Sequence, residues 1–373
     1  MKTISETLDG YYGARIEPTV RKKGELQCVG FYADFTDDRF IPDFNILEKT
    51  ISLLGDILLS PNLHDSVFRE DYTIGERSNL IDDIRAVIND KRGYSIVRLL
   101  EEMCRGEAFG VRSLGCEEEA RSITPESLTA HYRDMLAGSA INVFYCGSAN
   151  IARVEAALLP LLDKLPRDSV VKIPETKPVL YPATSAPRRF TEELDVTQGK
   201  LAIGFRLGKE IIETPDFLAL TVLNAVYGSG DMSKLFQNVR EKLSLCYSIG
   251  SSIDRHKGVM VVAAGVDPEK SDTALDEIMA QLSHVKSGAI SEQELASAKR
   301  SVITSLKLAM DRPGGLGELY FDSYVSKEPY DPNKLCGSIE AVTLDNVVEG
   351  ASDINADSIY FLTGHDGGSH RGA

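Results

Sequence analysis

The sequence has no long hydrophobic run and no secretory leader. Its longest unbroken apolar stretch is Val259–Ala264, far short of the ~20 residues that a helix needs to span a bilayer. The first residues, Met1–Glu6, include no apolar core of a signal peptide. We therefore expect a cytoplasmic protein that makes no contact with membranes.

Positive charge and paired cysteines are also scarce. Lys and Arg number 41 against 56 Asp and Glu, which gives a formal net charge of −15. A phosphate-binding surface needs clustered positive charge, so nucleic acid is a poor candidate partner. None of the six cysteines forms a C-x-x-C pair. We predict reduced core residues, with no disulfide and no zinc knuckle.

The chain of 373 residues is long enough for two domains. The segment Pro166–Pro187 contains five of the 15 prolines. Proline lacks a backbone donor and biases the residue before it toward extended backbone. We therefore predict a semi-extended linker over 166–187. It would separate an N-terminal domain, residues 1–165, from a C-terminal domain, residues 188–373.

The two halves resemble each other in the order of their elements. Residues 11–29 and 246–262 each suggest a strand, a polar turn and a second strand. A long helix with apolar residues at helical spacing follows in both halves, over Phe44–Leu59 and Ser271–Val285.

Each half also closes in the same way. Residues 122–128 are followed by the apolar segment Ile141–Gly147, and residues 341–347 are followed by Ser358–Gly364. This matched order predicts an α+β fold of two tandem homologous domains. Each domain would have an antiparallel sheet with helices on one face.

The proposed duplication is uneven at its start. Lys257 lies 67 residues after Phe190, whereas Lys23 lies 22 residues after Met1. The difference predicts that the first domain lacks its opening strand and helix. Such a domain would expose a strand edge and apolar surface, so we expect self-association or a partner covering that face.

The most informative segment is Gly228–Ser248. Its glycines can end one helix, and Ser233 can cap the next. That second helix has an apolar face (Leu235, Phe236, Val239, Leu243). Arg240 points elsewhere, and Tyr247 opens a strand seven residues later. A helix with one buried apolar face and an arginine on its surface would also explain the pattern, and it would imply no function.

This segment resembles the insulinase/pitrilysin-type zinc metallopeptidases, which include the mitochondrial processing peptidases. In that family a Gly-rich turn precedes a helix bearing an arginine, followed by "GLAY" or a similar sequence. Here Ser244–Tyr247 reads SLCY instead. The resemblance covers nearly the whole chain and implies a clamshell of two domains. It also implies that Arg240 and Tyr247 contact substrate.

The zinc motif of that family is absent from these residues. Family enzymes carry H-x-x-E-H on an early helix, which places two histidines on one face to bind zinc. No two of the six histidines here are four residues apart. Glu76 and Asp83 occupy the family's downstream acidic positions, although Asp83 replaces the glutamate that serves as third zinc ligand. We predict no catalytic residue, no metal ligand and no cofactor.

Three functions remain open at this point. The first is a catalytically inactive homologue that binds a peptide or protein partner, either as a homodimer or beside a catalytically complete bacterial relative. The second is an active zinc metalloendopeptidase whose H-x-x-E-H motif lies in an N-terminal segment not present here, with zinc as its cofactor. The third is a purely structural subunit.

Overall fold

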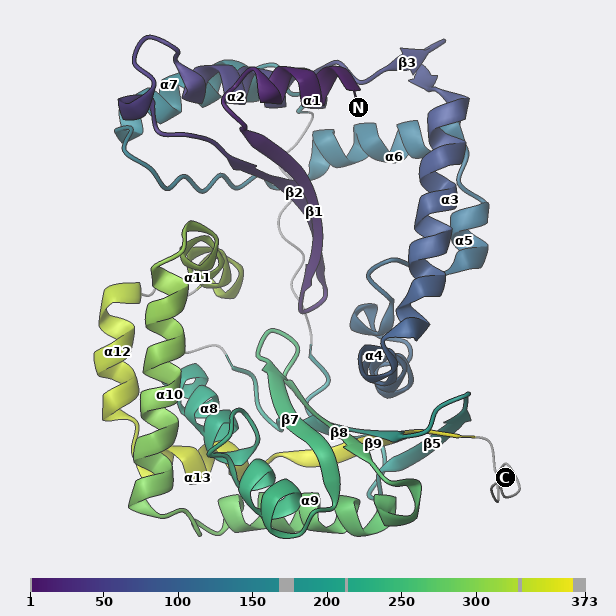
Figure 1. The fold of residues 1–373 in the computed structure, drawn as a ribbon, viewed down its shortest axis with the longest axis vertical. Helices are drawn as coiled ribbons and strands as arrows, with labels where there is room; N and C mark the ends of the chain where they lie inside the picture. Colours follow the sequence, from purple (N-terminus) through teal and green to yellow (C-terminus); the bar gives the residue numbers. More distant parts are fainter. Residues whose placement is uncertain (1, 168–177, 212–213, 328–330, 365–373) are drawn as a thin grey trace, which may run out of the picture. The chain divides into compact units, whose positions relative to one another are not determined.

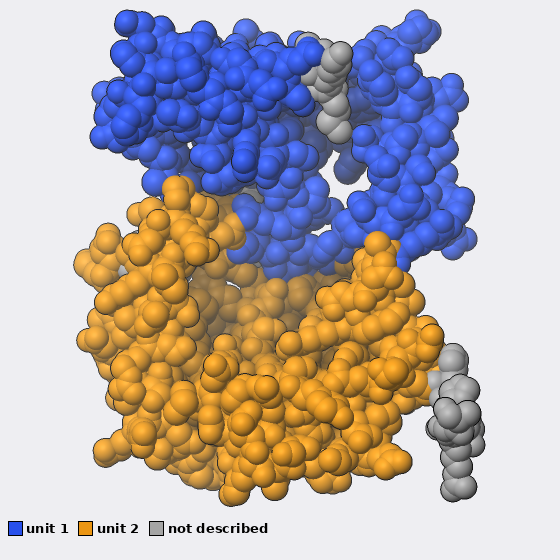
Figure 2. All heavy atoms as spheres, in the orientation of Figure 1, with its two compact units in different colours: residues 1–85, 113–175 blue, residues 86–112, 176–373 orange. Residues whose placement is uncertain are grey.

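A computed structural model describes residues 2–167, 178–211, 214–327 and 331–364. The chain divides into two compact units (Figure 2). Unit 1 comprises residues 1–85 and 113–175, and unit 2 comprises residues 86–112 and 176–373. Among the described residues, no helix is both long and apolar enough to cross a bilayer.

Unit 1 is mostly helical, with two short antiparallel hairpins (Figure 1). Its elements are α1 (Lys2–Asp9), β1 (Arg15–Lys23), β2 (Leu26–Asp34), η1 (Asp38–Phe40), α2 (Ile46–Leu59), β3 (Leu63–His64), β4 (Val67–Phe68), α3 (Glu70–Ala86), α5 (Glu117–Arg121), α6 (Pro125–Gly138) and α7 (Ile151–Leu162). In its described part, β1 pairs with β2 and β3 pairs with β4, and no larger sheet forms.

Unit 2 is built on one five-stranded sheet. Its elements are η2 (Val87–Asn89), α4 (Lys91–Met103), η3 (Ala108–Gly110), β5 (Arg188–Glu193), β6 (Gly199–Arg206), α8 (Thr214–Tyr227), η4 (Leu235–Lys242), β7 (Cys246–Asp254), β8 (Val259–Val266), η5 (Pro268–Lys270), α9 (Ser271–Lys286), α10 (Glu292–Met310), α11 (Pro313–Ser326), α12 (Pro332–Ala341), α13 (Leu344–Ser352) and β9 (Asn355–Thr363).

The strand order of this sheet is β5-β9-β6-β8-β7. All neighbours are antiparallel except β5 and β9, which run parallel. A parallel pair needs a long connection, and here almost the whole of unit 2 lies between the two strands. The mixed α/β architecture predicted from the sequence is confirmed, with this one parallel pair as a difference.

Helices cover both faces of the sheet, not one. Alternate β6 residues such as Ile203 and Phe205 point into a core shared with α8, α9 and α13. Ala202 points the other way and packs with Leu99 of α4. Gly204 allows this close approach, because a Cβ there would lie 2.4 Å from Met103 Sδ. Helix α4 lies in the N-terminal half of the sequence. The spacing of apolar residues along the chain therefore did not predict that it packs on this sheet.

The predicted helices and hairpins form close to the expected positions. Helices α2 and α9 match the two predicted long helices within two residues. The hairpins β1–β2 and β7–β8 turn at Gly24 and Gly258, both with left-handed backbone (φ +56° and +71°). Most of the segment that closes the second half, residues 358–364, lies in strand β9.

The apolar segment Ile141–Gly147, which closes the first half, does not form a strand as its counterpart in the second half does. These residues form neither helix nor strand, and Ile141 and Val143 are 45% and 55% exposed. A strand exists only when a neighbour pairs with its backbone groups. The apolar alternation is present, but none of unit 1's described strands pairs with it.

The predicted linker is only partly described, since residues 168–177 lie outside the described ranges. Residues 178–187 form neither helix nor strand. The two compact units differ from the predicted domains at one place. Residues 86–112 precede the linker, yet they pack within unit 2. We call this segment the strap.

Candidate functional site

Arg240 lies on η4, an eight-residue π-helix. The π form is rare, and where it occurs it is frequently at functional sites. The Ser233 hydroxyl accepts a hydrogen bond from the Phe236 amide at 3.3 Å, close to the predicted helix start. Leu235 and Val239 are fully buried, so they fix the helix while Arg240 stays on its outer side.

The Arg240 side chain is 38% exposed and makes few contacts. Its guanidinium lies 4.5 Å from the centre of the Phe236 ring, and its Nε lies 3.6 Å from Glu241 Oε1. The ring contact is a cation–π interaction. The arrangement holds the guanidinium in place and leaves hydrogen-bond donors for another molecule.

Tyr247 lies at an irregularity in β7. The pairing with β8 shifts between Cys246 and Ser248, so Tyr247 is an extra residue in the strand, as in a β-bulge. Bulges redirect side chains and are common beside functional sites. The Tyr247 ring is 64% exposed. Burial raises the pKa of the neighbouring Cys246 thiol to about 11, and the charge of Arg240 opposes that rise. The Ser244 amide donates to the Arg240 carbonyl at 3.1 Å, so Arg240 lies near the start of β7.

Ser244 links the π-helix to β7 and has left-handed backbone, with φ +53°. The Leu245 amide then donates to the Val239 carbonyl at 3.0 Å, which closes the turn. An L-residue in this conformation costs about 1–2 kcal/mol, whereas glycine adopts it freely. This geometry gives a physical reason for the glycine that the family motif carries at this position.

Ser244→Gly is therefore expected to raise the free energy of unfolding by about 1 kcal/mol, because it removes the left-handed strain. Ser244→Ala keeps the Cβ atom and serves as the matched control, with no expected gain. Urea unfolding of both variants checks this. Equal midpoints for the two variants would contradict the strain argument.

The Gly-rich turn before η4 serves close packing. A Cβ on Gly228 would lie 2.5 Å from Ser251 Oγ and 2.7 Å from Leu235 Cδ1. The Gly228 carbonyl accepts the Ser251 amide of β7 at 2.9 Å. The turn thus brings the end of α8 against β7, next to η4.

Glu76 and Asp83 lie on α3 of unit 1, two helical turns apart, and both are exposed. Glu76 Oε2 accepts a hydrogen bond from Asn79 Nδ2 at 3.4 Å. Within the described ranges, no three His, Cys, Asp or Glu side chains converge in a way that could hold a metal ion. His365 and His370 lie outside these ranges. The described residues therefore do not fit the zinc site of the resembled family.

Sequence reasoning missed a buried ionic cluster that anchors the strap to the sheet. Arg206 Nη2 lies 2.6 Å from Glu107 Oε1, and Arg206 Nε lies 3.1 Å from Asp357 Oδ2. Lys257 Nζ lies 2.6 Å from Glu107 Oε2. Arg206 and Asp357 are each 2% exposed, and Lys257 is fully buried. Charged residues in or beside apolar strands were the available signal, but Glu107 is 99 residues from Arg206 and 150 residues from Lys257 in sequence.

The pKa values of the two carboxyls reflect this pairing. Burial alone would raise the pKa of Asp357, but Arg188, Ser358 and Arg206 together hold it below its usual value. Burial likewise opposes ionisation of Glu107, yet Arg206 and Lys257 lower its pKa. Both carboxyls are therefore ionised at neutral pH and form ion pairs with positively charged side chains of this same chain.

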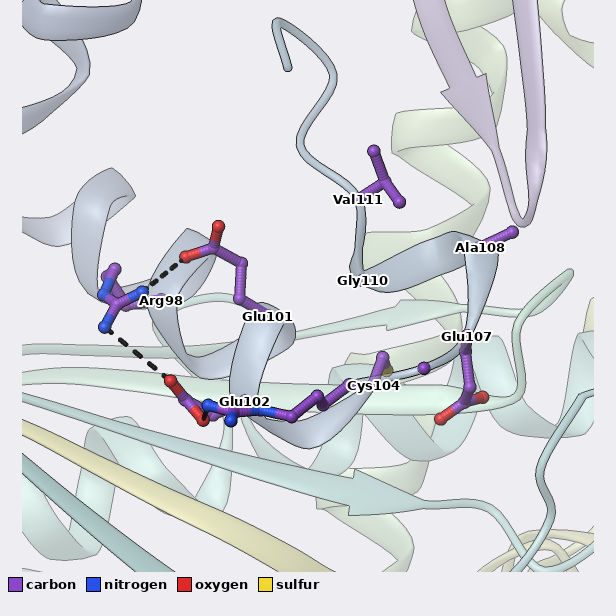
Figure 3. Close-up of a pocket in the computed structure, with 10 residues that line it drawn as sticks. Arg98, Glu101, Glu102, Cys104, Glu107, Ala108, Gly110 and Val111 are labelled. Atoms are coloured by element: carbon purple, nitrogen blue, oxygen red, sulfur yellow. Dashed lines mark hydrogen bonds and ion pairs between the residues drawn. The ribbon is translucent and has the colours of Figure 1, made fainter. Parts of the chain in front are cut away.

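The strap also borders a surface pocket of about 580 Å³ (Figure 3). Its walls come from α4, η3 and the residues between and just after them (Arg98, Glu101, Glu102, Cys104, Arg105, Gly106, Glu107, Ala108, Gly110, Val111). Arg98 pairs with Glu101 at 2.8 Å and with Glu102 at 3.7 Å. Of the cysteines predicted to be core residues, Cys104 and Cys246 are buried, whereas Cys116 and Cys146 are exposed, so for these two the prediction is wrong. Charged side chains that line this pocket form ion pairs with one another. The pocket therefore continues the ionic cluster that anchors the strap to the sheet.

Comparison with known proteins agrees with this architecture. A crystal structure of a conserved protein from Enterococcus faecalis V583 superposes with a TM-score of 0.86 at 26% identity, covering 99% of this chain and 86% of that one. A peptidase M16 inactive domain from Pseudomonas fluorescens superposes with a TM-score of 0.77 at 15% identity, covering 97% and 84%. The chain therefore has the fold of M16-type peptidase domains.

The sequence matches point to the same family. Residues 122–302 match the family model described as the peptidase M16 inactive domain. A probable inactive metalloprotease, YmfF of Bacillus subtilis (strain 168), is 29% identical over 97% of this chain and 84% of its own length. The chain is similar to the peptidase M16 family, which confirms the metallopeptidase resemblance predicted from the sequence.

Proposed function

We propose that this chain is a non-catalytic M16 protein that binds an extended polypeptide segment on unit 2, around Arg240 and Tyr247. The observation that carries the proposal is that three energetically unfavourable backbone features occur together in the segment that contains Arg240 and Tyr247. They are the π-helix that carries Arg240, the left-handed Ser244 and the bulge at Tyr247. Such irregular backbone concentrates at functional sites.

The chemistry of the site suits an extended peptide. A guanidinium can donate to a peptide carbonyl or carboxylate, and an exposed tyrosine ring offers flat contact area with a hydroxyl at its tip. Strand β7 is an outer strand of the sheet, and an outer strand can pair with an added one. The naming of relatives as inactive supports binding without cleavage. A catalytically complete relative would then be a fitting partner in the cytoplasm.

The proposal can be tested with fluorescein-labelled β-casein, a naturally unfolded protein. We expect saturable binding by anisotropy and no new fragments on a gel, with or without added zinc. Arg240→Ala and Tyr247→Ala should each weaken binding about tenfold or more, as is typical of central contact residues. Arg300→Ala and Tyr181→Ala, two exposed residues of the same unit, serve as matched controls.

Each alternative predicts a different result. Turnover of β-casein that needs stoichiometric zinc would overturn the proposal and support an active peptidase. Binding that is unchanged in both site variants, or no binding at all, would instead favour a purely structural subunit.

A further inference from the structure

Two positively charged side chains on the second face of the unit 2 sheet, Arg92 and Lys200, differ from the other cations around the strap. The strap contains four arginines, and three of them, Arg98, Arg105 and Arg112, form ion pairs with glutamates. Within the described ranges, neither Arg92 nor Lys200 forms an ion pair. In a chain whose net charge is −15, this place has positive charge to offer to another molecule.

The strand register places Lys200 and Ser248 on the same face of the sheet. Lys200 of β6 and Ser248 of β7 both lie opposite Gly265 of β8. Residues directly opposite each other in antiparallel strands point to one face. Ala202, two residues after Lys200, packs with Leu99 of α4 on the second face, so Lys200 points to that face as well. Figure 1 shows α4 on this side of the sheet and α9 on the other.

Gly265 leaves space for polar atoms between these two side chains. A Cβ on Gly265 would lie 3.0 Å from Ser248 Oγ and 3.1 Å from Gln198 Oε1. Lys200 Nζ donates a hydrogen bond to the same Gln198 oxygen. The ammonium of Lys200 therefore reaches toward the Ser248 hydroxyl, which has no hydrogen-bond partner among the residues that the structure describes.

Arg92 completes this polar group from α4. Its Nη2 atom lies 3.4 Å from the position of a Cβ on Gly250, which is two residues beyond Ser248 in β7. Burial and the charge of Arg92 lower the pKa of Lys200, and the charge of Asp90 opposes this shift. The two cations are therefore near neighbours. Asp90 is the carboxylate that lies beside them, and it caps α4 by accepting from the Arg92 amide at 3.1 Å.

We propose that Arg92, Lys200 and Ser248 bind one carboxylate of the polypeptide held on unit 2, either an acidic side chain or the C-terminal carboxylate. This rests on the proposed function, because Ser248 directly follows Tyr247 in β7. A guanidinium offers a carboxylate two parallel donors, and an ammonium adds a point charge. Two cations beside Asp90 leave one positive charge, which a carboxylate balances and a phosphate dianion exceeds.

The experiment uses the full chain and short overlapping peptides of dephosphorylated β-casein, labelled with fluorescein and ending in an amide. Binding is measured by anisotropy. Among peptides that bind, we expect one Glu→Gln change in the peptide to weaken binding about tenfold, as loss of a charge-assisted hydrogen bond does. A second peptide set ends in a free carboxylate. Tighter binding confined to that set would assign the subsite to the C-terminal carboxylate.

Variants of the chain connect this preference to the subsite. Arg92→Gln and Lys200→Gln should each weaken binding of the acidic peptide about tenfold and leave its Glu→Gln analogue unchanged. Arg92→Lys keeps the charge and should retain most of the affinity. Arg300→Gln, at an exposed arginine of α10, is the matched control and should affect neither peptide. The packing of α4 depends on Leu99, so the subsite variants should remain folded.

The subsite and the proposed function fail in different ways. Binding that depends on Arg240 and Tyr247 but shows the same Glu→Gln effect in the Arg92→Gln/Lys200→Gln double variant would overturn the subsite alone. A preference for acidic peptides that depends on Arg92 and Lys200, with no effect of Arg240→Ala, would support the subsite and overturn the first proposal. If no peptide binds, both are wrong. General electrostatic attraction does not imitate the expected result, because a net charge of −15 repels acidic peptides.

Discussion

Glu107→Gln is expected to lower the free energy of unfolding of unit 2 by about 3 kcal/mol, one of the two largest effects we predict. Glu107 accepts from both Arg206 and Lys257, which are almost fully buried. The amide keeps the shape of the side chain but removes its charge. Arg206 and Lys257 then each lose an ionised partner, and a buried charge that is less well compensated is costly.

The measurement is a urea titration with pulsed hydrogen exchange, read on peptides from β6 and β9 so that unit 2 is followed by itself. Asp272→Asn is the matched control. Its carboxylate pairs with Arg189 at 3.1 Å but is 84% exposed, and exposed pairs contribute at most about 1 kcal/mol. If Glu107→Gln changed the midpoint no more than Asp272→Asn, the anchoring role of the cluster would be wrong.

The same cluster sets a pH dependence with a definite sign. The pKa values of Glu107 and Asp357 are lower in the folded chain than their ordinary values. Their contribution to stability is therefore complete above the ordinary carboxyl pKa of about 4 and is lost as the pH falls through the folded values. Between neutral pH and strong acid, the stability of unit 2 should fall less steeply in Glu107→Gln than in the unmodified chain.

Leu99→Ala is the second change with a large expected effect, about 3 kcal/mol. Leu99 is fully buried against the sheet. It packs with Ala202, Val261 and Tyr360 on the second face of the unit 2 sheet. Shortening it leaves a cavity between α4 and β6. Because α4 precedes the linker in sequence, a loss of unit 2 stability would show that the strap is part of that unit's core.

Leu308→Ala on α10 is the control for this prediction, since Leu308 is 55% exposed and should lose less than about 1 kcal/mol. Pulsed hydrogen exchange of β6 and β9 again gives the stability of unit 2. Destabilisation confined to unit 1 peptides would contradict the assignment of the strap to unit 2.

The strap relates these predictions to the candidate site. Arg92 at the start of α4 approaches Gly250 of β7, where a Cβ would lie 3.4 Å from its Nη2. The sheet that carries Tyr247 is thus packed on its second face by a segment from the other half of the sequence. We expect damage to this packing to affect peptide binding on unit 2 only through the stability of the sheet.

Local structure was largely predictable from sequence because it depends on neighbouring residues. The helical spacing of apolar residues predicted α2 and α9. The polar residues predicted the two hairpin turns, and each of these turns contains a glycine with positive φ. Arg240, and Tyr247 of the SLCY segment, were also singled out as candidates by pattern. Residues 141–147 show the limit, because their pattern is that of a strand but a strand requires a partner from elsewhere in the chain.

The sequence by itself indicated the mixed α/β class, the resemblance to M16 peptidases, and Arg240 and Tyr247 as candidate binding residues. Only the tertiary structure decided that residues 86–112 belong to unit 2, that Arg206 and Lys257 are neutralised by Glu107, and that Ser244 is left-handed. Helix and turn preferences act over a few residues, whereas burial and ion pairing join residues 99 to 151 positions apart. The spacing of residues along the chain does not predict those distant contacts.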